Sequence, residues 1–160
     1  MPIPEQVKIV ITLQDGSLVI MSFITNDHHG IIQEPTSKNI NAIIAKSEKM
    51  WPAPARSWRI ITDAQIPTDR YFRNAWTDSV FGIKVNIAKA KEIHKNNLRA
   101  LRAPVLNDLD VAYMRADEAG NEKLKAEISS KKQTLRDITK HPDFAKARTP
   151  EQIKAIKVHT

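Results

Sequence analysis

The side chains that could carry out chemistry are few and scattered. Two adjacent histidines, His28 and His29, follow Asp27 in a stretch that reads as a loop, and imidazoles in a loop can bind a metal ion or transfer a proton. Neighbouring residues of an extended chain point in opposite directions, and Asp27 alone does not complete the ligand set of a typical metal site. We therefore interpret both histidines as structural or solvated and predict no metal site.

The other candidate residues form no catalytic pattern. His94, His141 and His159 are far apart, and the chain has no cysteine, which excludes thiol catalysis and thiolate metal sites. Its 4 glycines leave no phosphate-binding loop, and no serine stands in the strand-turn-helix context of a hydrolase nucleophile. The sequence predicts a protein that is not an enzyme, with no catalytic residues and no cofactor.

Four acidic residues lie close together in the second half of the chain, at Asp108, Asp110, Asp117 and Glu118. On a helix these positions spread around the surface, and each has a basic neighbour within reach. Paired carboxylate catalysis is therefore not expected.

Residues 86 to 139 are expected to form a long antiparallel helical hairpin. Small or apolar residues, together with His94, recur every three or four positions from Ile87 to Ala119, and a second stripe runs from Leu124 to Ile138. Gly120 and Asn121 between the stripes supply the left-handed residue that ends a helix. The second arm spans only roughly 26 Å at 1.5 Å per residue, so it reaches back to about Pro104, where we expect a kink or interruption.

The outer half of the first arm, residues 86 to 103, therefore needs another partner. That partner is either the N-terminal part of the chain or another subunit. After Pro142 stops the second arm, Thr149 and Gln152 match a capping box with Pro150 at the first helical position, which predicts a short last helix. Its isoleucines, Ile153 and Ile156, need a groove in which to bind.

The N-terminal part is expected to form a small α+β module. Two runs rich in β-forming residues, Val7 to Leu13 and Leu18 to Ile24, flank Asp15-Gly16, which is a strong hairpin signature. Both faces of these strands are largely apolar, so other elements must cover them. A helix from Thr36 to about Met50 supplies one cover, and Trp58 to Thr62 predicts a third strand.

The fold class predicted is α+β: residues 1 to 83 form the sheet module with its helix, and residues 84 to 160 the helical hairpin with a short last helix. Within the first module, Asp63 to Trp76 reads as short capped turns. Its aromatics either anchor a partner or pack in the core, and core packing is favoured. From exposure and stripe direction, we predict partner contacts at Trp76, Leu98, Arg99, Leu101 and Arg102.

The charge of the chain is +7, and the excess lies entirely in the second half. Residues 1 to 83 hold eight Lys/Arg and eight Asp/Glu, whereas residues 84 to 160 hold seventeen and ten. A basic nucleic-acid-binding face is one interpretation, but the lysines alternate with acids and few aromatics accompany them, so we favour a solvated or protein-facing surface. No apolar run is long enough to span a membrane, and residues 1 to 5 lack the features of a signal peptide, so we expect a soluble protein made in the cytoplasm.

The chain from about Trp58 to Lys157 resembles a family of tailed-bacteriophage proteins encoded among virion and tail-fibre genes. The pieces that carry the resemblance, in order, are Pro67-Thr68-Asp69-Arg70 with Phe72-Arg73-Asn74-Ala75-Trp76, Lys89-Ala90-Lys91-Glu92-Ile93-His94, Leu109-Asp110-Val111 with Arg115-Ala116-Asp117-Glu118-Ala119-Gly120, Lys132-Gln133-Thr134-Leu135-Arg136-Asp137-Ile138, and Thr149-Pro150-Glu151-Gln152-Ile153. The piece Gln133 to Ile138 is also similar to the end of tail-fibre assembly chaperones. The strands from Val7 to Ile24 lie outside the resemblance, and the aromatic Trp-Pro ending typical of those chaperones is absent.

This resemblance implies a non-enzymatic structural protein of the virion, made in the host cytoplasm and associated with the tail or tail fibre. Its partners would be other phage structural proteins. The apolar stripe from Ile87 to Leu101 and the two-faced strands predict buried contacts beyond one monomer, so we also expect contacts with further copies of the chain, and we expect no membrane and no nucleic acid. A tail-fibre assembly chaperone, absent from the finished particle, is the alternative, and a basic nucleic-acid-binding protein is a third. The resemblance carries no mapped site residue to this chain.

Overall fold

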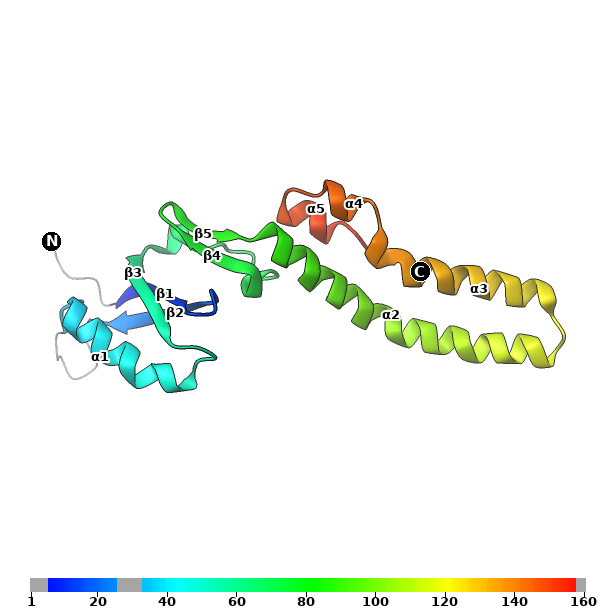
Figure 1. Ribbon diagram of the computed structural model, residues 1–160, viewed down its shortest axis with the longest axis horizontal. Coiled ribbons are helices and arrows are strands. Elements are labelled where there is room, and N and C mark those ends of the chain that lie inside the picture. Colours follow the sequence, from blue (N-terminus) through cyan, green and yellow to red (C-terminus); the bar gives the residue numbers. More distant parts are fainter. Residues whose placement is uncertain (1–5, 26–32, 158–160) are drawn as a thin grey trace. The chain divides into compact units, whose positions relative to one another are not determined.

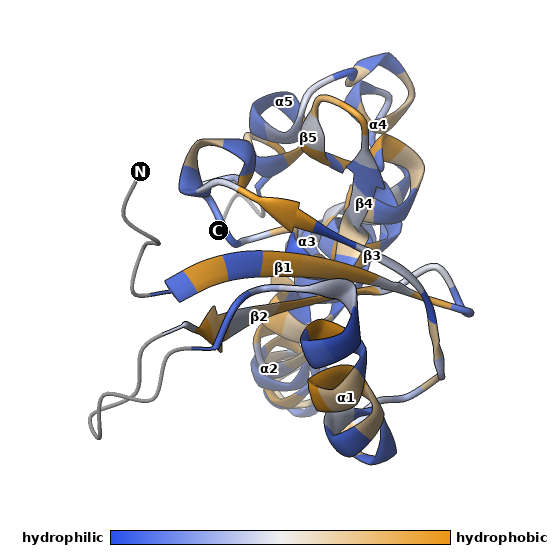
Figure 2. Ribbon diagram, turned by 90° about the vertical axis from the view of Figure 1, so that its left-hand side faces the viewer, coloured by the Kyte–Doolittle hydropathy of each residue, from blue (hydrophilic) through white to orange (hydrophobic). Residues whose placement is uncertain are grey.

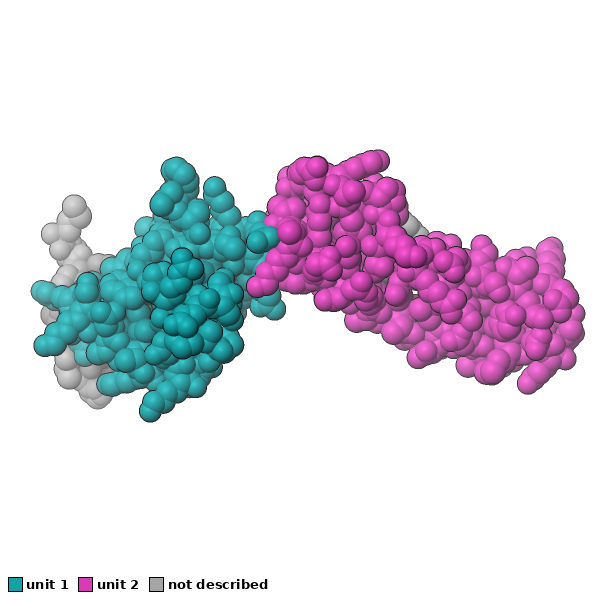
Figure 3. Space-filling model, in the orientation of Figure 1, with its two compact units in different colours: residues 1–86 teal, residues 87–160 magenta. Residues whose placement is uncertain are grey.

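The computed structural model describes residues 6–25 and 33–157, which fall into two units, residues 1–86 and 87–160 (Figure 3). The fold class is α+β, as the sequence predicts. The boundary lies three residues after the expected one, because a strand from Gly82 to Val85 belongs to the first unit. The His28-His29 pair and Asp27, considered above as a metal site, lie outside the described residues, as does His159.

A three-stranded antiparallel sheet forms the centre of unit 1. Its strands are β1 (Gln6–Leu13), β2 (Leu18–Ile24) and β3 (Ala55–Ile61), in the order β2-β1-β3 (Figure 1). The turn between β1 and β2 uses Gly16 at φ 79°, and the Asp15 carboxylate accepts hydrogen bonds from the backbone N–H and hydroxyl of Ser17. The predicted hairpin and third strand are therefore confirmed.

Helix α1 (Ser37–Ser47) supplies the core of one sheet face. Thr36 caps this helix by accepting a hydrogen bond from the Asn39 backbone N–H, and a 3₁₀ turn, η1 (Glu48–Met50), follows it. In Figure 2 the helix lies beside the strands. The buried side chains that meet there come from both elements: Ile9, Ile11, Leu13, Phe23, Ile40 and Ile44.

A second, two-stranded sheet supplies the core of the opposite side, which the sequence did not predict. Strands β4 (Trp76–Ser79) and β5 (Gly82–Val85) follow the 3₁₀ turns η2 (Asp63–Gln65) and η3 (Arg73–Ala75). Trp76 and Ile83 from this hairpin pack with Val10 and Ile61 of the larger sheet. Both faces of β1 are thus covered within unit 1, so the expectation that this strand needs a partner from outside the chain is wrong.

Unit 2 contains the predicted helical hairpin, formed by α2 (Ile87–Glu118) and α3 (Glu122–Asp137) (Figure 1). Gly120, at φ 64°, ends the first arm, and the Asn121 side chain caps the second by accepting from the Leu124 backbone N–H at 3.1 Å. Helix α2 continues through Pro104, so of the kink or interruption expected there, the interruption does not occur.

Ion pairs join the two arms on their flank. The Lys125 ammonium contacts Asp117 at 2.6 Å, and Lys132 pairs with Asp110. Both lysines also lie over the ring of Tyr113, with distances of 5.7 and 5.2 Å from the nitrogen to the ring centroid. These contacts set the register of α3 against the distal half of α2.

The outer half of α2 packs against the C-terminal part of the same unit. After η4 (Ile138–Lys140) and α4 (Asp143–Lys146), helix α5 (Pro150–Lys154) begins with the predicted capping box and packs on α2. Ile153 is fully buried and Ile156 is 6% exposed. The His94 Nε2–H donates to the Ile156 carbonyl at 2.7 Å, a bond that fixes the proton on Nε2. The chain's own tail therefore covers the buried residues of this half, Ala90, His94 and Leu98, a cover that the sequence analysis did not name.

Replacing Gly120 by alanine is expected to destabilise unit 2 by roughly 1–2 kcal/mol, because Cβ is strained at positive φ although the surrounding space is open. Gly120→Asn is the matched control, since asparagine tolerates this conformation, and should lose less. Denaturant unfolding followed by far-ultraviolet circular dichroism measures both. Equal losses for the two variants would contradict the role of φ.

Truncating Ile153 to alanine is expected to cost roughly 2–5 kcal/mol, because the side chain is fully buried. The control Lys157→Ala changes an exposed neighbour and should stay within about 0.5 kcal/mol of the parent. Thermal and denaturant unfolding compare the two variants. A loss for Ile153→Ala no larger than that of the control would show that the tail does not close unit 2.

Candidate interaction surfaces

Two of the five predicted contact residues are buried inside their own units. Trp76 is 3% exposed in the core of unit 1, and Leu98 is 2% exposed in unit 2. The indole N–H of Trp76 is buried without an acceptor, so this side chain contributes packing and no directed contact. Burial removes both residues from the set of surface contacts, and it supports the core-packing interpretation of Trp76.

The three remaining predicted residues differ in what they do. Arg102 donates from Nη1 to the carbonyl oxygens of Leu135 and Arg136, at 2.9 and 2.6 Å, and so satisfies free acceptors at the end of α3. Arg99 is exposed and donates to the Asn96 side chain one turn earlier. Leu101 is 65% exposed and remains available for contact.

The end of the β4–β5 hairpin is the most exposed apolar feature of unit 1 that the structure describes. Val80 and Phe81 occupy the turn between the strands and are 84% and 82% exposed. Placing two large apolar side chains in water at a turn brings no benefit to folding. Such a pair is typical of a contact site, and the sequence analysis did not select it because neither residue belongs to a periodic stripe.

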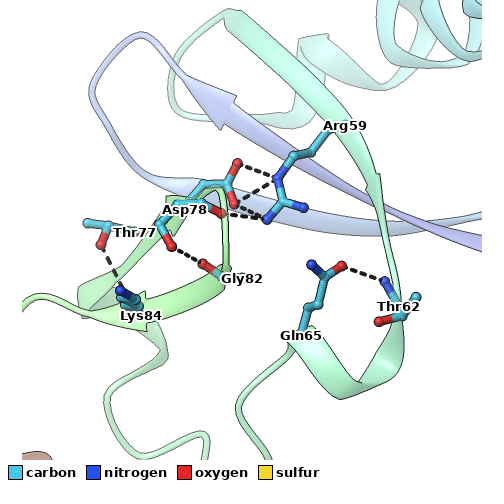
Figure 4. A network of polar contacts seen from close by, with 8 residues as sticks. Arg59, Thr62, Gln65, Thr77, Asp78, Gly82 and Lys84 are labelled. Carbon is cyan, nitrogen blue, oxygen red and sulfur yellow. Dashed lines mark hydrogen bonds and ion pairs between the residues drawn. The ribbon is translucent and has the colours of Figure 1, made fainter.

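A network of polar contacts holds this turn to the larger sheet (Figure 4). The Arg59 guanidinium on β3 donates to both carboxylate oxygens of Asp78 at 2.6 to 3.1 Å, and to the Ser79 carbonyl at 2.9 Å. The Ser79 hydroxyl donates to the Gly82 carbonyl across the turn at 2.7 Å. A bidentate arginine fixes direction as well as distance, so the turn that carries Val80 and Phe81 is held in one orientation.

The electrostatics of the Arg59–Asp78 pair, which we call the Arg59 brace, agree with its geometry. The hydrogen bonds that the guanidinium donates to Asp78 raise the pKa of Arg59 above its ordinary value, because the carboxylate stabilises the charged guanidinium. The two side chains are 30% and 21% exposed, so water screens the pair only in part. The guanidinium of Arg59 therefore stays charged across the physiological range.

A second exposed feature is the outward surface of the distal half of α2. Exposed positions recur there at helical spacings of three, four and seven residues and so share one side of the helix. They are Pro104, Asn107, Asp108, Val111, Met114, Arg115 and Glu118. We call this set the outer face of α2. Val111 and Met114 are 42% and 57% exposed, although the opposite side of the same helix already packs on α3.

Four lysines of unit 2, Lys95, Lys125, Lys132 and Lys140, form ion pairs with acids among the described residues. Lys95 contacts Glu92, Lys140 contacts Asp137, and Lys125 contacts two acids at once. Hydrogen bonds to Asp117 and then Glu122 raise the pKa of Lys125 well above its ordinary value. Cations that already have carboxylate partners release few counterions on binding phosphate, so these paired lysines would add little to an electrostatic contact with phosphate.

An open groove of about 750 Å³ runs beside the end of α3. Its lining includes Gln133, Leu135 and Ile138, which belong to the piece similar to assembly chaperones. Leu135 and Ile138 are only 6% and 9% exposed, so these two side chains offer a ligand little apolar surface.

No three His, Asp or Glu side chains converge as metal ligands within residues 6–25 and 33–157. Within the same ranges, no helix combines the length and the apolar composition needed to cross a membrane. Comparison with known proteins adds no assignment: no protein-family model, curated protein or solved structure matches this chain.

Replacing Arg59 by lysine is expected to loosen the hairpin end, because an ammonium cannot bind Asp78 through two parallel bonds. Backbone amides of residues 80 to 82 should exchange roughly fivefold faster, which corresponds to about 1 kcal/mol of local stability. The matched control is Arg56→Lys, at an exposed position on the same strand. Hydrogen exchange read by mass spectrometry compares the two variants, and unchanged protection in Arg59→Lys would refute the brace.

Proposed function

We propose that this protein is a non-enzymatic structural component of a bacteriophage particle, associated with the tail or the tail fibre through protein–protein contacts. The observation that carries the contact role is the braced hairpin end: Val80 and Phe81 are almost fully exposed on a turn that Arg59 and Asp78 hold in place. A rigid apolar projection loses little conformational entropy on binding, which favours insertion into a pocket of a partner protein. The phage setting rests on the sequence resemblance.

The pieces that carry the resemblance occupy positions that determine the fold. Phe72, Ala75 and Trp76 are buried in unit 1, and Thr149 and Gln152 form the capping box of α5. A shared pattern at caps and core positions supports a shared fold for the second half of the chain. It supports no common binding site, because the apolar residues of these pieces are mostly covered.

The assembly chaperone is the second candidate, and the groove beside α3 favours it. Residues of the chaperone-like piece line this groove, so a segment of a fibre protein could lie there. The small apolar exposure of Leu135 and Ile138 limits the affinity that such a segment would gain. A virion component accounts better for the larger exposed surfaces at the hairpin end.

The location of the protein after phage assembly separates the two candidates. A structural component is expected in purified particles at a fixed ratio to the other tail proteins, as measured by quantitative mass spectrometry. A chaperone would be abundant in infected cells and absent from particles. Absence from particles, together with binding to an isolated fibre protein, would overturn the proposal.

Replacing Phe81 by serine is expected to reduce incorporation into particles by roughly tenfold or more, because a central aromatic anchor contributes at least about 1.4 kcal/mol. Folding should be unchanged, since the ring is 82% exposed. The control Met50→Ser removes another large apolar side chain, 81% exposed in the same unit, and should be incorporated normally. Complementation of a phage that lacks the gene, followed by particle composition, tests both variants.

A further inference from the structure

We infer that the outer face of α2 binds the same face of a second copy of this chain, with the two helices antiparallel. This inference names one partner for the contact role proposed above, and its physical argument stands without the phage setting. The face comprises Pro104, Asn107, Asp108, Val111, Met114, Arg115 and Glu118, as defined earlier.

The first step concerns what α2 already buries. Its inward side is covered within unit 2, by α3 along the distal half and by the C-terminal part along the outer half. The opposite side of an ordinary two-helix hairpin is expected to be charged. Here the charged residues Asp108, Arg115 and Glu118 are interspersed with Pro104, Val111 and Met114, and the last two are 42% and 57% exposed. A helix that is partly apolar on this second side has a second surface to cover.

The second step concerns the acids and bases of the same region. Asp110 and Asp117, on the flank towards α3, pair with Lys132 and Lys125. Asp108 and Arg115 lie on the outer face, are exposed, and have no ion-pair or hydrogen-bond partner among the side chains of the described residues. Two acids, Asp108 and Glu118, and one base, Arg115, therefore remain on the outer face.

The third step is the spacing of one of these acids, Asp108, and the base. Asp108 and Arg115 are seven residues apart, which is about 10.5 Å along a helix and nearly two full turns, so they lie on the same side. When two copies run antiparallel about a two-fold axis between Val111 and Ala112, Asp108 of each copy meets Arg115 of the other. The self-complementary pattern gives two reciprocal ion pairs, as a closed two-fold interface requires.

The same register aligns the apolar side chains. Val111 lies next to the two-fold axis and therefore faces Val111 of the other copy. Met114 reaches towards Val111 and Asn107 of the other copy. Pro104 lies against the small Ala119 at the far end, which allows the helices to approach closely. The seam has an apolar centre and one charged flank, and a parallel arrangement would place Asp108 opposite Asp108 with no compensating base.

The affinity expected of this seam is modest. It is a two-helix contact with few large apolar residues, so a dissociation constant on the order of 10 µM is expected. This concentration is within reach of sedimentation equilibrium and small-angle scattering. High local concentration on an assembled particle would strengthen such a contact by avidity.

Charge exchange tests the pairing directly. Asp108→Arg and Arg115→Asp should each weaken dimerisation at least about tenfold, because each places like charges opposite one another twice. The double variant carrying both changes should dimerise as the parent does, since the pairs are restored with reversed polarity. Glu127→Arg, an exposed acid on α3 outside the outer face, is the control and should have no effect. Circular dichroism verifies that every variant is folded.

A second measurement fixes the register. The chain has no cysteine, so Val111→Cys supplies a single thiol, which should form a disulfide between two copies under mild oxidation. Glu127→Cys should not. A parent that stays monomeric at several hundred µM, or a double variant that remains as weak as the single ones, would overturn the inference. Both readouts use the purified full chain, so they are independent of whether the protein occurs in virions.

Discussion

Strand β1 imposes the constraint from which the rest of unit 1 follows. Ile9, Ile11 and Leu13 point to one side of the sheet and Val10 to the other, and all four are almost completely buried. A strand that is apolar on both faces requires two covers. An apolar face left in water would lose several kcal/mol of the free energy gained by burial. Helix α1 is one cover and the β4–β5 hairpin is the other. The Arg59 brace that orients the exposed turn is therefore a product of the same requirement, since β3 and β4 must pack together before Arg59 can reach Asp78.

In unit 2 the corresponding element is the long helix α2. Its inward side is divided between two partners, the antiparallel helix α3 and the tail that contains α5. Polar contacts reinforce both halves, Lys125 and Lys132 on the distal part and His94 and Arg102 nearer the tail. Because these contacts use up the acids and bases on the inward flanks, the charges left on the outward side become informative. The pairing within the hairpin thus decides which residues are available for contacts between molecules.

The sequence predicted the elements whose signals are local. The Asp15-Gly16 turn, the Gly120-Asn121 junction and the Thr149 capping box all appeared where expected, because turns and caps depend on residues a few positions apart. The β4–β5 hairpin was missed, since its strands have four residues each and its turn, Ser79 to Gly82, carries two large apolar side chains. The long-range packing of α2 was also not predicted from the sequence. Periodicity identified the stripe of α2 that must be buried, but the stripe itself does not say that Ile153 and Ile156 bury it. Trp76 and Leu98 were selected as contacts for the same reason: an apolar residue does not reveal from its type alone whether it faces the core or a partner.

The packing of α5 on the first turns of α2 has a consequence for how the protein is made. These two segments are separated by more than fifty residues, so the core around Ala90, His94 and Leu98 cannot close until residues 150 to 156 have left the ribosome. At about 5–20 residues per second, the apolar side of α2 remains uncovered for several seconds after its own synthesis. During that interval the nascent helix is exposed to aggregation or to chaperones. All strands of unit 1 have already left the ribosome by then. The order of synthesis therefore places the vulnerable step late, in the unit whose surfaces we assign to contacts with a second copy.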